Sequence, residues 1–294
     1  MNERDTDVAR DHKAIDWNGV IAARYRIEQT LRYEYDAPIH DLRHQLMIAP
    51  RARHLDQERL EHRIWSSSDS PLTHKTDSFG NDVSSVWVPH VEREIAFNLD
   101  STIVRAAQAT CASSRYADPH DTRWLRGGRM TRADAAMLEV AAEIRALHPN
   151  DRDCALAIMR YVHRHMEYTK GVTDVFTTAS TAFHMARGVC QDFSHIAISL
   201  ARACGIGARY VAGHLLGEGA THAWIELLVP TKTGLVVMSL DPTYCSATDF
   251  RYVVVAIGRD YDDVPPTSGV FSGRGAGTLH GQQRVSLIDL TYAA

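Results

Sequence analysis

Residues 186–214 read ARGVCQDFSHIAISLARACGIGARYVAGH, and this stretch decides the fold of the second half of the chain. Its apolar side chains recur at the spacing of one helix face, at Phe193, Ile196, Ala197, Leu200 and Cys204. Gly205 follows as a C-terminal cap, because glycine readily adopts the left-handed conformation that ends a helix. Cys190 lies one turn before Phe193, so we expect it at the N-terminal end of this helix, on the buried side.

The position of Cys190 favours a reactive thiol. The first N–H groups of a helix have no intrahelical acceptor, and the positive end of the helix dipole lies there. Both features favour a thiolate over a thiol. A cysteine on an apolar stripe is more often a packing residue, so a catalytic interpretation requires a base nearby.

The candidate for this base is a histidine in a β-hairpin that is predicted further along the chain. Residues 221–230 (THAWIELLVP) and 235–244 (LVVMSLDPTY) are typical of two strands joined by the turn TKTG. A turn centred between Lys232 and Thr233 pairs the residues of one apolar face, which are Ile225 with Leu240, Leu227 with Met238, and Val229 with Val236. A slip of one residue would break this face, so the hydrophobic pattern predicts the register.

The other face of the hairpin carries His222, Trp224 and Glu226, and His222 lies diagonal to Asp241. An aspartate beside a histidine fixes its tautomer and stabilises the imidazolium formed during catalysis. The alternative is a surface pair of little consequence in a chain with 16 histidines. The candidate nucleophile Cys190 favours the catalytic interpretation. Because Glu226 shares this face, we expect the histidine end of the face to meet the helix.

The rest of the chain divides into segments of different pattern. Residues 1–20 are charged and resemble a solvated tail. Residues 21–110 alternate with period two between turns, which predicts a small antiparallel β-domain that is separate from the chemistry and supports it by packing. Residues 111–130 lack a clear period and are expected to be a linker, and residues 131–294 form the expected catalytic domain.

Two helices are expected early in the catalytic domain. Thr131 followed by Asp134 resembles a helix cap before ADAAMLEVAAEIRALH, and Asp151 opens a helix that contains CALAIMRYVHRHM. The β-domain holds none of the five cysteines. Its exposed polar residues, such as Arg43 and His44, are therefore expected to affect substrate preference more than nucleophile reactivity.

Composition excludes several classes of function. Hydrophobic residues make up 45% and charged residues 23% of the chain, a normal globular balance. The net charge of −4 gives no basis for a nucleic-acid or anionic-membrane partner, and no apolar run approaches the ~20 residues that span a bilayer. The charged N-terminus lacks a secretory signal and the cysteines form no CxxC pair, so we expect a cytoplasmic protein without structural zinc.

Three blocks around the candidate residues resemble the transglutaminase-like superfamily. They are GVCQDF at 188–193, HAW at 222–224 and DPT at 241–243. Their order, and their setting on a helix, a strand and the next strand, agree with the family. The block IGRDYDDVPPTSGVFSG at 257–273 and the N-terminal β-region are similar to the bacterial branch of transglutaminase-like cysteine peptidases.

The resemblance implies an α+β fold with a papain-like core, in which a catalytic helix packs on an antiparallel sheet. It implies that Cys190 is the nucleophile, that His222 is the general base and then the acid, and that Asp241 orients His222. The backbone N–H of Cys190 is expected to donate to the oxyanion. The other possible oxyanion or substrate contacts are Gln191, Tyr168 and Trp224. No cofactor is implied, and no metal, because the acidic loops of the calcium-dependent animal enzymes are missing.

The predicted function is acyl transfer from amide bonds of a peptide or protein through a thioester at Cys190. Water as the acceptor makes a peptidase or amidase, which is the leading prediction, and a protein amine makes a cross-linking transglutaminase. An arylamine acetyltransferase ranks third, because no phosphate-cradling glycine loop is visible. A binding module without chemistry, and a metalloenzyme using His163, His165 and His214, are the alternatives from other classes. One sequence does not specify the substrate or the oligomeric state.

Overall fold

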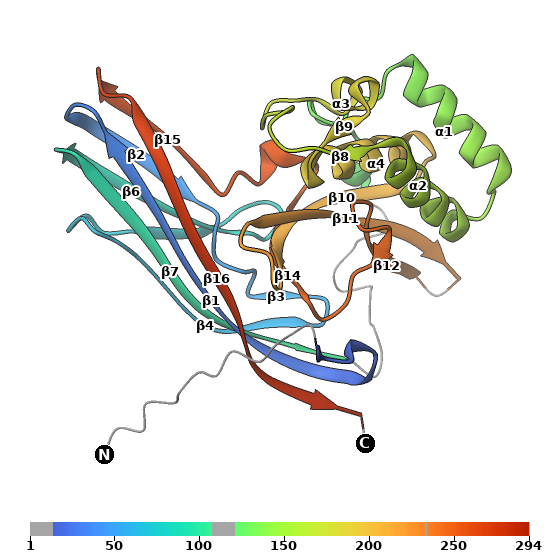
Figure 1. Ribbon diagram of the computed structural model, residues 1–294, viewed down its shortest axis with the longest axis horizontal. Coiled ribbons are helices and arrows are strands. Elements are labelled where there is room, and N and C mark those ends of the chain that lie inside the picture. The colour runs from blue at the N-terminus through green and yellow to red at the C-terminus, as the bar shows by residue number, and fades with distance from the viewer. Residues whose placement is uncertain (1–13, 108–120, 233, 294) are drawn as a thin grey trace.

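The computed structural model describes residues 14–107, 121–232 and 234–293, which form two lobes (Figure 1). A β-lobe of long strands lies beside a helical lobe, in which helices cover a second set of strands. The predicted α+β fold with an N-terminal β-region is confirmed.

The β-lobe is built from strands with one buried and one more exposed face. In β1 (Val20–Tyr35), the alternate residues Tyr25, Ile27, Gln29 and Leu31 are buried, whereas Arg26, Glu28 and Thr30 between them are partly exposed. The other strands of this lobe are β2 (Ile39–Leu46), β3 (Arg53–His54), β4 (Gln57–Ser66), β5 (Thr73–Thr76), β6 (Asp82–Val91), β7 (Glu94–Ala106), β15 (Thr267–Gly273) and β16 (Gly277–Tyr292). They form sheets of order β16-β1-β7-β4-β3 and β15-β2-β6-β5.

The last two strands of the chain return to the β-lobe, which corrects the predicted boundary between the domains. β16 pairs with β1 along its length, from Tyr35↔Gly277 to Val20↔Tyr292, and β15 pairs with β2. The prediction placed both strands in the catalytic domain at 131–294, but their backbone groups complete edges of β1 and β2. The helical lobe is therefore inserted between β7 and β15. The first half of the predicted linker, residues 111–120, lies outside the described residues.

The helical lobe packs its helices on an antiparallel sheet of order β13-β12-β11-β10-β14. Its helices are α1 (Ala135–Leu147), α2 (Asp151–His165), α3 (Ala179–Met185) and α4 (Cys190–Ala203). Its strands are β8 (Glu167–Tyr168), β9 (Arg187–Gly188), β10 (Gly207–Leu215), β11 (Thr221–Thr231), β12 (Gly234–Asp241), β13 (Ser246–Ala247) and β14 (Tyr252–Gly258). Short 3₁₀ turns span Trp17–Gly19, Thr122–Leu125 and Tyr261–Asp263. Nearly all of α4 is buried, because α1, α2 and α3 pack against it as well as β10 and β11.

Capping residues set the limits of the predicted helices. Asp134 accepts a hydrogen bond from the N–H of Met137 at the start of α1, so Asp134, and not Thr131, is the cap. Asn150 caps α2 in the same way. The expected stop after α4 is confirmed, because Gly205 adopts a φ of +79°.

Two side-chain amides of the β-lobe join it to the free edge of β14. Gln57 donates to the carbonyl of Val254 at 2.7 Å and accepts from its N–H at 2.8 Å. Asn81 donates to the carbonyl of Ile257 at 2.8 Å and accepts from its N–H at 2.9 Å. An edge strand otherwise leaves such groups unpaired, so the β-lobe completes the sheet of the helical lobe.

A buried charged cluster lies at the same junction. His54 Nε2 is 2.6 Å from Glu226 Oε1, and Arg209 Nη1 is 3.6 Å from Glu226 Oε2. Burial opposes the charge of Glu226, but His54, Arg209 and Arg51 lower its pKa to about 2. Burial lowers the pKa of His54 despite the neighbouring carboxylate, so a neutral histidine bonds a charged glutamate.

Candidate active site

The start of α4 is held in place by its own third residue. Asp192 accepts hydrogen bonds from the N–H of Val189 and from the hydroxyl of Thr173, both at 2.7 Å. Gly188 is required here, because a Cβ at this position would lie 2.4 Å from Asp192 Oδ2. Cys190 is therefore the first residue of the helix, as predicted, and it is half-buried.

The hairpin register predicted from the apolar pattern is confirmed. Ile225 pairs with Leu240, and the ladder continues down to Thr231 and Gly234. This register brings the side chains of His222 and Asp241 together, with His222 Nε2 2.7 Å from Asp241 Oδ2.

Asp241 is fully buried and accepts four hydrogen bonds. Its Oδ2 accepts from His222 and from the hydroxyl of Tyr252 at 2.9 Å. Its Oδ1 accepts from the backbone N–H groups of Thr243 at 2.8 Å and Tyr244 at 3.3 Å. These donors fix the carboxylate, which in turn fixes the plane and tautomer of the imidazole.

His222 lies between Asp241 and Cys190. Burial lowers the pKa of His222, but hydrogen bonds to Asp241 and to the Cys190 side chain outweigh burial and raise it to about 10. Because Nε2 bonds Asp241, the other ring nitrogen is the one left to face the sulfur. The site therefore favours an imidazolium beside the cysteine sulfur.

The helix meets both faces of the hairpin at different places. Phe193 and Ile196 of α4 share a core with Ile225, Leu227 and Leu240, which form the apolar face of the hairpin. The body of the helix packs there because burying the apolar side chains decides the packing. The histidine end of the polar face meets the start of the helix, as expected, because His222 bonds the Cys190 side chain.

Glu218 is a site residue that the sequence analysis missed. It lies in the loop between β10 and β11, with Oε2 3.6 Å from His222 Nδ1. The hydroxyl of Tyr244 donates to its other oxygen. The spacing of four residues between Glu218 and His222 was a visible signal, but a bend in a loop, not a helix, brings the two side chains together.

The three additional candidate contacts occupy different places. Trp224 is buried, and its indole N–H donates to Ser239 Oγ at 3.1 Å, so it packs beside His222 and is not open to substrate. Gln191 Nε2 donates to the carbonyl of Val175 at 3.3 Å and so holds the loop before α3. Tyr168 is half exposed and lines the same cavity as Cys190, and burial together with Cys190 and Glu218 raises its pKa.

A cavity of about 440 Å³ opens beside this cluster, between the two lobes. Cys190, His222 and Tyr168 line it from the helical lobe, and Gln29 and Met47 line it from the β-lobe. The sequence analysis named Arg43 and His44 as exposed residues of the β-domain that affect the substrate. The structure corrects that choice, because His44 is buried and stacks on Phe97, and neither residue lines this cavity.

Comparison with known proteins agrees with this geometry. The model of the transglutaminase-like superfamily matches residues 138–242, and the model of the bacterial transglutaminase-like N-terminal region matches residues 25–104. The chain belongs to the transglutaminase-like superfamily. Both matches lie in the expected order, the N-terminal region in the β-lobe and the core in the helical lobe.

Individual relatives match part or most of the transglutaminase-like chain. An uncharacterized protein of Mycobacterium leprae is 28% identical over 275 residues, which cover 87% of this chain and 96% of the relative. An uncharacterized protein of Mycobacterium tuberculosis is 38% identical over 121 residues, or 37% of this chain. The crystal structure of a candidate cysteine protease from Cytophaga hutchinsonii is similar in fold, with a TM-score of 0.76, 20% identity and coverage of 92% and 93% of the two chains.

Two of the other described cysteines of this transglutaminase-like chain, Cys154 and Cys204, are buried. Burial raises the pKa of Cys154, and burial together with Cys154 raises that of Cys204 to about 12. Cys245 is half-buried, and Cys111 lies outside the described residues.

No group of three or more metal-ligating side chains occurs in the described parts of the chain. His163 and His165 each bond a backbone carbonyl, and His214 is buried at the cavity, so the structure does not bring these three candidates together as a ligand set. Asp262 and Asp263 are paired with Arg129 and Arg259. Of the helices described, none is long and apolar enough to cross a membrane.

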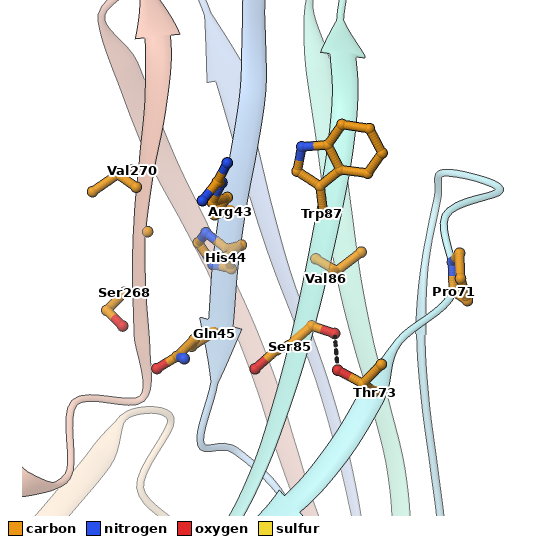
Figure 2. Close-up of a pocket in the computed structure, with 11 residues that line it drawn as sticks. Arg43, His44, Gln45, Pro71, Thr73, Ser85, Val86, Trp87, Ser268 and Val270 are labelled. Carbon is orange, nitrogen blue, oxygen red and sulfur yellow. Dashed lines mark hydrogen bonds between the residues drawn. The ribbon is translucent and has the colours of Figure 1, made fainter.

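A second hollow lies on the open sheet of the β-lobe, away from this site. Figure 2 shows Val270 of β15, Arg43 of β2 and Trp87 of β6, which follow one another across the sheet and are all more than half exposed. None of the residues that line it belongs to the helical lobe. It contains no candidate nucleophile.

Proposed function

We propose that this chain is a cysteine-nucleophile enzyme that transfers acyl groups from amide bonds, with Cys190, His222 and Asp241 as its catalytic residues. The observation that carries the proposal is the chain of contacts from Asp241 through His222 to the Cys190 sulfur at the start of a helix. An imidazolium and a helix N-terminus both favour the thiolate.

In the first half-reaction, the Cys190 thiolate attacks the amide carbonyl and a C–S bond forms. The tetrahedral intermediate collapses when the C–N bond breaks, and His222 gives its proton to the leaving amine. The products are a free amine and a thioester at Cys190.

Donors for the oxyanion come from the start of α4 and from β8. The N–H of Cys190 is one, because the first N–H groups of α4 have no intrahelical acceptor. We assign the second to the hydroxyl of Tyr168, which lines the same cavity as Cys190. Gln191 is less suitable, since its side-chain amide already bonds Val175.

In the second half-reaction, an acceptor attacks the thioester while His222 removes its proton, and the thiol of Cys190 is regenerated as its C–S bond breaks. Water as the acceptor makes the enzyme a peptidase or amidase, which is the reaction we favour. The fold similarity to a candidate cysteine protease agrees with this choice but rests on fold alone.

A primary amine is the second candidate acceptor. The position of Glu218 supports an amine acceptor, because its carboxylate lies 3.6 Å from His222 Nδ1. The carboxylate can hold the ammonium form of the acceptor beside the imidazole, which then removes its proton. Reaction of the acylated enzyme with labelled alkylamines, compared with hydrolysis in the same mixture, decides between the two acceptors.

Selective alkylation tests the nucleophile. Limiting iodoacetamide at neutral pH should label Cys190 ahead of Cys111, Cys154, Cys204 and Cys245, as read by peptide mass spectrometry. Cys245 is the informative control, since it is also half-buried but has no histidine assigned to it. Substituting His222→Gln should remove the advantage of Cys190, and equal labelling of Cys190 and Cys245 in the natural chain would contradict the proposal.

A further inference from the structure

The cavity between the lobes is lined by two kinds of residue. At its mouth lie Tyr168 and Lys170, which are exposed, next to Cys190 and His222. Its interior is formed by largely buried and mostly apolar side chains from both lobes, among them Met47, Ile48, Val255 and Val264. Its volume of about 440 Å³ is in the range of pockets that enclose small ligands.

The residues that line the cavity include few charged side chains. Among the described residues that line it, Lys170 is the only lysine or arginine, and there is no aspartate or glutamate. The buried polar residues in the lining are Gln191 and His222 at the mouth, and Gln29 and His214. Burial lowers the pKa of His214 to about 4, so this histidine is uncharged at neutral pH. A charged group in the interior, beyond His222 and Lys170 at the mouth, would lose its hydration without gaining a partner of opposite charge.

We propose that this cavity binds the acyl portion of the substrate and selects uncharged, mainly apolar side chains next to the reacting carbonyl. The inference rests on the proposed function, because it takes Cys190 as the acylated residue. It also gives the β-lobe a definite role. Gln29, Met47 and Ile48 form the wall that the helical lobe alone would lack.

Among the residues that line the cavity, Met47 is the one best suited to a substitution that tests side-chain selection. It follows β2 directly and is only partly buried, and its N–H donates to the carbonyl of Pro266 at 2.9 Å. The backbone is therefore fixed by a bond that a substitution of the side chain does not remove. A larger or charged side chain here enters the cavity while the core of the β-lobe stays intact.

Chloromethyl ketones of acetylated norleucine, glutamine and glutamate test the selection, because they alkylate the nucleophile only after the acyl side chain is seated. Each rate constant is divided by that of iodoacetamide for the same variant, which reports the thiol alone. The natural chain should react with the norleucine probe at least about 100-fold faster than with the glutamate probe, and glutamine should fall between them.

Two substitutions of Met47 then locate the selection. Met47→Trp fills the cavity and should lower the normalised norleucine rate by about tenfold or more. Met47→Lys supplies a positive charge and should raise the glutamate rate relative to norleucine. Met185→Trp, on an exposed position of α3 outside the cavity, is the matched control and should change no ratio. Thermal unfolding shows whether each variant is folded. If Met47→Trp is not folded, Met47→Lys alone tests the role of this position.

The result that overturns the inference is equal normalised rates for all three probes, or ratios that neither substitution of Met47 alters. A failure of the proposed function looks different, because iodoacetamide would then not distinguish Cys190 from Cys245. The two ideas can therefore fail separately.

Discussion

Strand β11 contributes one residue to each of two buried histidine–carboxylate pairs, and the pKa of the histidine shifts in opposite directions in the two pairs. His222 on this strand bonds Asp241 at 2.7 Å, and Glu226, four residues later on the same face, bonds His54 at 2.6 Å. The pKa of His222 is raised to about 10, whereas that of His54 is lowered. The two geometries are nearly the same, so geometry alone does not decide which histidine is charged.

The difference lies in the neighbours of each carboxylate. Arg209 and Arg51 act on Glu226, so its charge is balanced without a proton on His54. The groups that act on His222 are Asp241 and the Cys190 side chain, so a proton on the imidazole balances the charge there. The first pair joins two lobes, and the second is poised to hold and release a proton.

Replacing each carboxylate by its amide tests this contrast most directly, and the largest effect is expected for Asp241→Asn. The amide oxygen can keep the bonds from Thr243 and Tyr244, which leaves its NH₂ facing His222 Nε2 and imposes the wrong tautomer. We expect kcat to fall by about 10⁴-fold in steady-state assays. A variant that keeps more than a tenth of the activity would remove Asp241 from the mechanism.

The matched substitution Glu226→Gln should instead affect stability. It leaves Arg209 buried without the carboxylate at 3.6 Å, which typically destabilises a protein by about 3–5 kcal/mol. Denaturant unfolding measures this loss. The alkylation rate of Cys190 in the folded protein should stay within about twofold of the natural value, and a selective loss of that rate would mean that the two pairs are coupled.

The pH dependence of stability should reflect both the histidine with a raised pKa and the histidines with a lowered pKa. The pKa of His222 is raised from 6.5 to about 10, so its contribution is complete below pH 6.5 and is lost as the pH rises through about 10. Burial lowers the pKa of His44 and His214 to about 4 and that of His195 to about 3. Their contribution is complete above pH 6.5 and is lost as the pH falls through about 4.

Each of these groups changes the free energy of unfolding by at most about 1.4 kcal/mol per pH unit within its window. Melting temperatures between pH 4 and pH 10 should therefore be highest near neutrality. Asp241→Asn should flatten the alkaline side and leave the acidic side unchanged. An unaltered alkaline side would show that Asp241 does not hold the proton on His222.

The smallest effect is expected for Glu218→Gln, which removes the second carboxylate near His222. Glu218 is partly exposed, so its interaction with the imidazole is worth less than about 1 kcal/mol. Its loss should reduce the ratio of aminolysis to hydrolysis of the acyl-enzyme about two- to fivefold, with acylation nearly unchanged. Tyr244→Phe, which removes only the hydroxyl that bonds Glu218, should act in the same direction and less strongly.

The parts of the molecule that could be predicted are those set by neighbours in the sequence. The start of α4 and the register of β11 with β12 follow from local periodicity, which is why His222 and Asp241 could be paired without a structure. β15 and β16 could not be assigned, since their side chains are mostly exposed and carry little periodic signal. Their partners are more than 200 residues away in the sequence. The cavity wall formed by Gln29 and Met47 could not be predicted either, because it depends on how the two lobes pack against each other.

The insertion of the helical lobe between β7 and β15 has a consequence for biosynthesis. A ribosome makes β1 before the helical lobe and β16, its partner along nearly all of its length, after it. The sheet that carries Gln29 is therefore incomplete while α4 and the hairpin of β11 and β12 emerge, and the pocket wall is unfinished with it. A nascent chain would thus carry a potentially reactive cysteine before it had a complete substrate pocket. Pairing of β16 with β1 finishes that pocket only after α4 and the hairpin have both been made.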